Sequence, residues 1–365
     1  MTLIKVKTRG TDNVSSRKNL LINGGMLVDQ RQATMQFNAS SNYRCDRWYQ
    51  GVSGGGTFQF THSDDTPAGF GKSIKIQCTT ADTSLDAGAY GYIMHKLEGN
   101  ALQSMNSTNG IVEHTISFYA KASKTGVYTV NLRDEDNGQG NSKTFTISNA
   151  NTWERYALTF PAHSSGTLDN DNLSSYRIYW WFASGTNQTS GTFYNGTWGA
   201  HSNPNRVSSS NVNLGDNTSN NFLITGIQME VGNSASDFEH RSFAEELTLC
   251  QRYHYRIVGN EVNNASDGGF AVTTNWDNSV FFITLDFPIQ MRAGPSMSFG
   301  AALSDFLILQ AGATNAPTGI SLNGASKQRC EMNFQKSGGF GSAGTSGWIR
   351  IVDNTNGFIA FDSEL

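Results

Sequence analysis

Aromatic residues that could hold a sugar lie in one short stretch, residues 176–182, whose side chains alternate between two faces. The period of two is typical of a β-strand and places one set in the core: Tyr176, Ile178, Trp180 and Phe182. The opposite face carries Arg177, Tyr179 and Trp181. An exposed aromatic ring stacks on the apolar C–H face of a pyranose, while a nearby polar group fixes its orientation. The pattern predicts a sugar platform, unless an insertion or a neighbouring subunit covers this face.

Further aromatic candidates lie in residues 185–221, a segment rich in Asn, Ser, Thr and Gly that holds only two charged residues. A polar loop of this length is uncommon in a compact domain unless it is functional or disordered. We interpret it as a long surface insertion, and we expect Tyr194 and Trp198 to supply further ligand contacts. The same insertion is the first candidate to cover Tyr179 and Trp181.

Catalytic patterns are weak by comparison. The seven histidines show no H-E-x-x-H spacing, and no G-x-S-x-G is present. Three acidic clusters, at 64–65, 134–136 and 245–246, fit turns or a helix start. Residues 134–138 resemble half a calcium loop, but Gly138 stands fifth rather than sixth and no Glu closes it, so we expect a hairpin turn. We expect no enzyme, no cofactor and no metal site.

Composition narrows the class of protein. Of the 365 residues, 15% are charged and 38 are Gly, which is typical of an all-β protein with many turns. The net charge of −4, without a basic stripe, argues against nucleic acid as a partner. The four cysteines show no C-x-x-C pairing, which fits assembly in a reducing cytoplasm. The N-terminus lacks the apolar core of a signal peptide, and we expect no membrane insertion.

Short alternating stretches separated by turn signals run through most of the chain. They predict an all-β fold, a jelly-roll β-sandwich followed by a short helix and a second, smaller β-domain. The junction between the two is residues 224–255, where an alternating strand ends at Gly232 and Ser242 stands three residues before Glu245 as a capping box. The expected segments are an arm at 1–18, the sandwich at 19–241, a linker helix at 242–256 and the second β-domain at 257–365.

The junction and the start of the sandwich resemble a module of bacteriophage virion proteins, namely tail-fibre, receptor-binding and capsid-fibre proteins of marine and cyanobacterial phages. The matching stretches near the start are 19–26, 30–31 and 46–48. Those near the end are 228–232, 237–241, 245–247 and 250–253. The resemblance implies a carbohydrate-binding jelly roll over about 19–256, assembled as a homotrimer. It also implies that the matching residues are structural signatures and not catalytic ones.

The first 18 residues carry a net charge of +4, from five basic residues against Asp12 alone. With the resemblance, they predict an arm that docks on another virion protein through Leu3, Ile4, Lys5, Val6, Lys7 and Arg9. The alternative is a frayed terminus. We therefore expect a virion protein, assembled in the host cytoplasm, that is a short tail fibre or a capsid fibre and contacts a host-surface glycan. Two alternatives stay open: a purely structural decoration or cement protein without a ligand, and a polysaccharide depolymerase with paired carboxylates.

Overall fold

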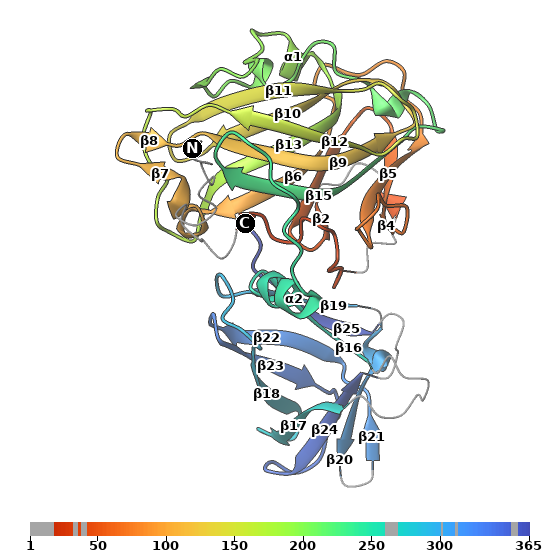
Figure 1. Cartoon of the computed structure of the whole chain (residues 1–365). Helices are drawn as coiled ribbons and strands as arrows, with labels where there is room; N and C mark the ends of the chain where they lie inside the picture. The colour runs from red at the N-terminus through yellow and green to blue at the C-terminus, as the bar shows by residue number, and fades with distance from the viewer. Residues whose placement is uncertain are drawn as a thin grey trace, which may run out of the picture. The chain divides into compact units, whose positions relative to one another are not determined.

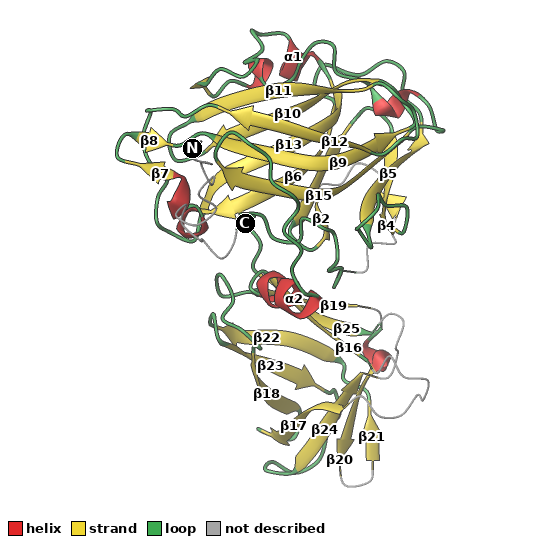
Figure 2. Ribbon diagram, in the orientation of Figure 1, coloured by secondary structure: helices red, strands yellow, loops and turns green. Residues whose placement is uncertain are grey.

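The computed structural model describes residues 18–31, 36–37, 42–259, 269–300, 302–310, 313–351 and 357–365. The expected attachment residues Leu3 to Arg9 lie outside this range. The chain divides into two compact units, residues 1–242 and 243–365. Within the described residues, strands dominate both units, and helices are confined to short segments such as α1 (Thr186–Thr189) and α2 (Phe243–Gln251) (Figure 2). Within the described ranges, no helix has the length and apolarity needed to cross a bilayer.

The first unit is an antiparallel β-sandwich of the jelly-roll type, which confirms the predicted fold class (Figure 1). The back sheet holds six strands in the order β1-β4-β5-β15-β9-β12: Gln36–Phe37, Thr57–Ser63, Ser73–Thr80, Asn221–Val231, His114–Ala122 and Glu154–Phe160. The front sheet holds seven strands in the order β14-β11-β10-β13-β6-β3-β2: Gly199–Ala200, Gln139–Ile147, Gly126–Asp134, Ser174–Ser184, Tyr90–Glu98, Trp48–Ser53 and Asn42–Cys45. A small β-ribbon pairs β7 (Asn106–Ser107) with β8 (Gly110–Ile111).

The core lies between the two sheets and contains the inward set of β13, as the alternation predicts. Trp180 packs on Trp48 of the same sheet and on Phe118 of the back sheet, with ring centroids 5.7 and 5.9 Å apart. Phe182 meets Phe58 at 5.0 Å in an edge-to-face contact. Such pairs add to the hydrophobic stabilisation from burial alone. The inward side chains of this one central strand therefore pack against residues of both sheets.

The residues that carry the virion-protein resemblance interlock the two ends of the sandwich. The Asn19 side chain accepts a hydrogen bond from Met229 N and donates one to Ile227 O, at 3.1 and 3.2 Å. Glu239 accepts the backbone N–H of Asn19 at 2.7 Å, and Arg241 donates to Leu21 O at 2.9 Å. These contacts join segments more than 200 residues apart, so the two signature stretches form one structural closure.

One glycine shows how tight this closure is. A Cβ on Gly24 would come within 2.0 Å of Ile227 O, far inside contact distance. Ile227 N in turn donates to Gly24 O at 2.9 Å. Only glycine lets the two backbones approach this closely.

The described part of the second unit contains helix α2, a short 3-10 helix at Leu303–Asp305 and two antiparallel sheets. A three-stranded sheet has the order β16-β25-β19: His254–Val258, Phe358–Asp362 and Ser296–Gly300. A seven-stranded sheet has the order β21-β20-β24-β17-β18-β23-β22: Ala313–Asn315, Phe306–Gln310, Ser346–Ile351, Gly269–Asn275, Val280–Asp286, Arg329–Gln335 and Gly319–Ala325. Their shared core is built on Phe281, Phe306, Phe334, Ile349 and Phe361, all fully buried.

The linker helix is shorter than the sequence predicted. Helix α2 spans Phe243–Gln251, directly after Ser242, and His254–Val258 forms strand β16 instead of a further helical turn. Tyr255 and Ile257 alternate toward the core of the second unit, so a period of two governs this segment. The expected helical residues 254–256 are therefore the start of a strand paired with β25.

Candidate functional site

The predicted aromatic platform is not exposed. Tyr179 and Trp181 lie on the outer face of the front sheet, as expected, but their exposed fractions are 4% and 1%. They form a second small core with Met94 and Val207, separate from the core between the sheets. The expectation of an open Tyr–Trp surface is therefore wrong, and any contact between these two rings and a ligand stays a prediction.

A strap from the insertion covers both rings. Val207 packs among them, and the Arg206 guanidinium stands over Tyr179 and Trp181, 4.5 and 4.8 Å from the ring centroids. The strap is fixed to two strands: Arg206 Nε donates to Asn131 Oδ1 at 3.0 Å, and the Ser142 hydroxyl donates to Arg206 O at 2.7 Å. Cation–π contacts in a desolvated site are worth about 2 kcal/mol, so the strap is a built part of the fold.

The two insertion aromatics are also structural. Tyr194 is buried over Gly140 of β11, and its hydroxyl donates to Ala200 O and accepts from Ser202 N at 2.9 and 2.8 Å. Trp198 is half-buried and donates from Nε1 to Pro161 O at 2.7 Å, with its ring 4.5 Å from that of His163. Neither ring lies in the small core formed by Tyr179 and Trp181. The structure therefore does not bring Tyr194 and Trp198 together with the predicted platform. Their role as ligand contacts stays a prediction.

Arg177 belongs to a row of basic side chains across three strands of the outer face. The strand register places it between Lys96 of β6 and Arg133 of β10. The Glu135 carboxylate accepts from Arg177 Nε and pairs with Arg133 at 3.5 Å. Arg206 adds a further cation to this face, over Tyr179 and Trp181.

Half-buried tyrosines that the sequence reasoning did not select continue the same face. The rings of Tyr90 and Tyr92 stack with centroids 5.6 Å apart, and Tyr92 lies 4.9 Å from Trp181. Across the next strand, Tyr49 lies in the row of Met94 and Tyr179, with Lys96 Nζ 5.3 Å from its ring centroid. The sequence could have identified these tyrosines through the alternation within residues 90–97 and 48–53. That alternation places them on the face opposite the core residues Ile93 and Trp48.

We call the half-buried part of this surface the tyrosine–arginine face. Its members are Tyr49, Tyr90, Tyr92, Lys96, Arg133 and Arg177. Burial raises the pKa of Tyr92, so its hydroxyl stays protonated and can donate a hydrogen bond. Burial, then the charges of Arg133 and Arg206, lowers the pKa of the nearby His201 to about 4. At neutral pH this histidine adds no charge, so the cations of this face are Lys and Arg side chains.

Chemically, the face offers aromatic rings, hydroxyl donors and cations with a shared orientation. Ring faces and edges accept the apolar side of a sugar, and guanidinium groups bind carboxylates or sulfates by charge-assisted hydrogen bonds. Arg206 and Val207 of the strap cover Tyr179 and Trp181, so the tyrosine–arginine face supplies the groups that remain at the surface.

Side chains of the first two acidic clusters form ion pairs with nearby basic residues and lie in or beside turns. Residues 135–138 form the turn between β10 and β11, which confirms the predicted hairpin. Asp64 pairs with Lys72, and Asp65 pairs with Lys121 at 2.6 Å. Asp134 is buried against His163, with 3.1 Å between carboxylate and ring nitrogen. Among the described residues, no group of three or more His, Cys, Asp or Glu side chains is arranged to hold a metal ion.

No protein-family model matches this chain, and comparison with curated proteins finds no match. Several solved structures are similar over a little more than half of this chain. The enzymatically active domain of tailspike protein 4 from bacteriophage CBA120 matches at 15% identity and TM-score 0.31, covering 59% of this chain and 21% of that one. The module TmCBM61, solved with β-1,4-galactotriose, matches at 7% identity and TM-score 0.31, covering 59% and 100%. The family 11 carbohydrate-binding module of Clostridium thermocellum matches at 12% and 0.27, covering 56% and 96%.

Proposed function

We propose that this chain is a non-enzymatic glycan-binding protein of a phage virion, and that its first unit holds an acidic glycan on the tyrosine–arginine face. The observation that carries the proposal is the row Lys96–Arg177–Arg133, which lies beside half-buried tyrosines on one sheet. Cations and ring faces at this spacing complement a chain of pyranoses that bear carboxylate or sulfate groups.

Virion display is supported by the sequence resemblance and by the closure that its residues build. Asn19, Glu239 and Arg241 bind one another's segments through the backbone, so these signatures maintain a module rather than a reactive centre. In this proposal the protein is a trimeric short fibre or capsid fibre, and the segment before Lys18 attaches it to the particle.

A glycan array with neutral, carboxylated and sulfated oligosaccharides tests the ligand. We expect signal on acidic glycans, reduced about tenfold or more by Lys96→Gln or Arg133→Gln, because a charge-assisted hydrogen bond contributes about 1.5–3 kcal/mol. Lys75→Gln is the matched control, since Lys75 lies on β5 of the back sheet. Equal signal from all three variants would place the ligand elsewhere, and no signal on any glycan would favour the purely structural alternative.

Co-sedimentation with phage particles tests virion display separately. Deletion of residues 1–17 keeps Lys18, whose backbone N–H donates to Glu239 at 2.9 Å, so the sandwich closure survives. We expect the shortened chain to lose particle binding and to keep glycan binding. Retention of particle binding would contradict an attachment role for this segment.

A further inference from the structure

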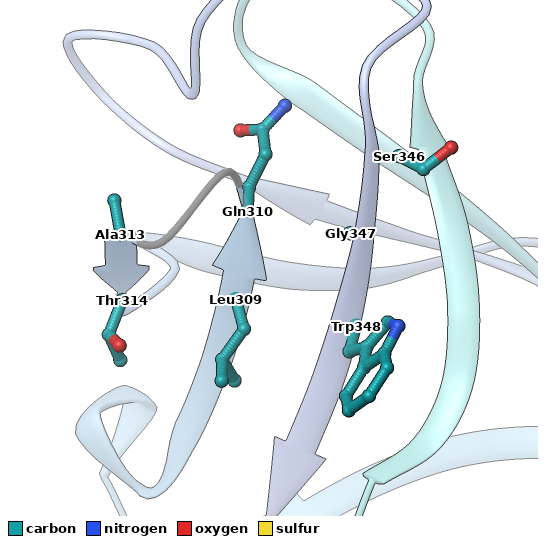
Figure 3. A pocket seen from close by; sticks show the side chains of 7 residues that line it. All are labelled: Leu309, Gln310, Ala313, Thr314, Ser346, Gly347 and Trp348. Atoms are coloured by element: carbon teal, nitrogen blue, oxygen red, sulfur yellow. The ribbon is translucent and has the colours of Figure 1, made fainter.

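The second unit contains a pocket that the glycan-binding face does not involve. It has a volume of about 350 Å³ and lies at one end of strands β20 and β24 (Figure 3). Leu309 and Trp348 are directly opposed on these strands, and Thr314 lies opposite Leu309 on β21. Ligand pockets commonly measure about 300–1,000 Å³, so the volume suits one or two sugar rings.

The pocket lies where the pairing of β20 with β24 ends. The last pair is Leu309 and Trp348, and the following residues, Gln310 and Gly347, also line the pocket. Figure 3 shows Gln310 and Ser346 toward one end, with the Leu309, Thr314 and Trp348 side chains toward the other. Hydroxyl and apolar groups therefore alternate along the pocket.

One side chain in the pocket lacks the surroundings that its chemistry usually requires. Trp348 is 56% exposed, an unusual state for an indole ring. Ser346 and Trp348 alternate with the buried Gly347 and Ile349, so both point to the outer face of the sheet. Gln310 is buried in phase with Phe306 and Ile308, so its amide lies on the core side of β20.

The lining also decides which ligand fits. The seven described residues around the pocket carry no charged side chain, only an amide, two hydroxyls and apolar groups. An ionised ligand would lose its hydration without gaining a counter-charge. A neutral pyranose instead places its C–H face on Trp348 and its hydroxyls near Thr314 and Ser346.

We propose that this pocket, which we call the Trp348 pocket, binds a neutral saccharide, independently of the tyrosine–arginine face. The competing explanation is burial against a second copy of the chain. Val272, which pairs with Trp348, is 75% exposed, and Trp276 is 74% exposed on the same unit. The pocket volume and the hydroxyls of Thr314 and Ser346 beside Trp348 favour the saccharide, because a flat apolar interface requires neither.

Titration of the full chain with neutral β-linked hexaoses of glucose, mannose, galactose and xylose tests this proposal by tryptophan fluorescence and calorimetry. We expect at least one to bind, with affinity lowered tenfold or more by Trp348→Ala and severalfold by Thr314→Val. Trp348→Tyr should restore most of the binding, because it keeps an aromatic face. Trp276→Ala is the matched control, an exposed tryptophan outside the pocket, and should bind like the unmodified chain.

Several results would overturn the Trp348 pocket. One is the absence of binding to all four hexaoses, and another is an equal loss in Trp276→Ala. Loss of neutral binding in Lys96→Gln would assign the sugar to the first unit. Sedimentation in which Trp348→Ala and Trp276→Ala both convert an oligomer to monomer, without any hexaose binding, would identify this face as an interface between copies. Failure of the acidic-glycan proposal leaves these outcomes unchanged, since its variants lie on the other unit.

Discussion

Tryptophan occupies two opposite situations in the two units. Trp181 of the first unit is almost fully covered, with Tyr92, Tyr179 and the Arg206 guanidinium around it. Trp348 of the second unit is more than half exposed beside a neutral pocket. Both residues alternate outward from a central strand. The comparison teaches that an outward aromatic residue becomes structural when a strap lies over it and stays available when no described segment covers it.

The largest expected effect concerns stability. Trp181→Ala should lower the free energy of unfolding of the first unit by about 3–5 kcal/mol, because it leaves a cavity under the strap. Trp348→Ala should change stability by no more than about 0.5 kcal/mol, as is usual for exposed positions. Urea unfolding of both variants measures the difference. Similar values for the two would contradict the distinction between a covered ring and a free one.

Acid should destabilise the first unit through its buried histidines. His114 accepts from the Tyr176 hydroxyl at 2.9 Å and lies 3.0 Å from Val112 O, and burial lowers its pKa to about 4. The unfolded chain binds this proton near pH 6.5, so the stabilisation is complete above that pH and is lost progressively toward pH 4. The loss amounts to about 3 kcal/mol at most, from 1.36 kcal/mol per pH unit.

Calorimetry between pH 7 and pH 4.5 checks this dependence. His95, whose pKa burial also lowers, should add to the slope in the same direction. His114→Gln should unfold at a lower temperature at pH 7 and show a flatter dependence between pH 6.5 and 4. A wild-type transition of the first unit that does not move in this window would show that His114 is not buried as described.

The smallest expected effect is the salt dependence of ligand binding, which should differ between the two proposed sites. Binding of an acidic oligosaccharide to the tyrosine–arginine face should weaken about tenfold when ionic strength rises from about 0.05 M to about 0.5 M, because screening shortens the reach of its cations. Binding of a neutral hexaose to the Trp348 pocket should stay nearly constant. Parallel calorimetric titrations at both salt concentrations measure the two affinities. Equal salt dependence at the two sites would contradict a charged site in the first unit and a neutral site in the second.

Local patterns predicted much of the fold. Alternation located the central strands, such as β9, β10 and β13, and identified Trp180 and Phe182 as core residues. The Asp-Asn-Gly turn between β10 and β11 was also predictable, because it depends on residues adjacent in sequence. The helix end was not, since His254–Val258 joins β25 from the far end of the chain.

The sequence by itself determined which side of each strand a residue occupies, because successive side chains of a strand must point to opposite faces. It therefore set Arg177, Tyr179 and Trp181 together on one surface. Only the tertiary structure decided what lies over that surface. Arg206 and Val207 come from a segment with no periodic signal, and hydrogen bonds to Asn131 and Ser142 place them there. Contacts between distant segments, and not local spacing, decide whether an aromatic ring is core or binding surface.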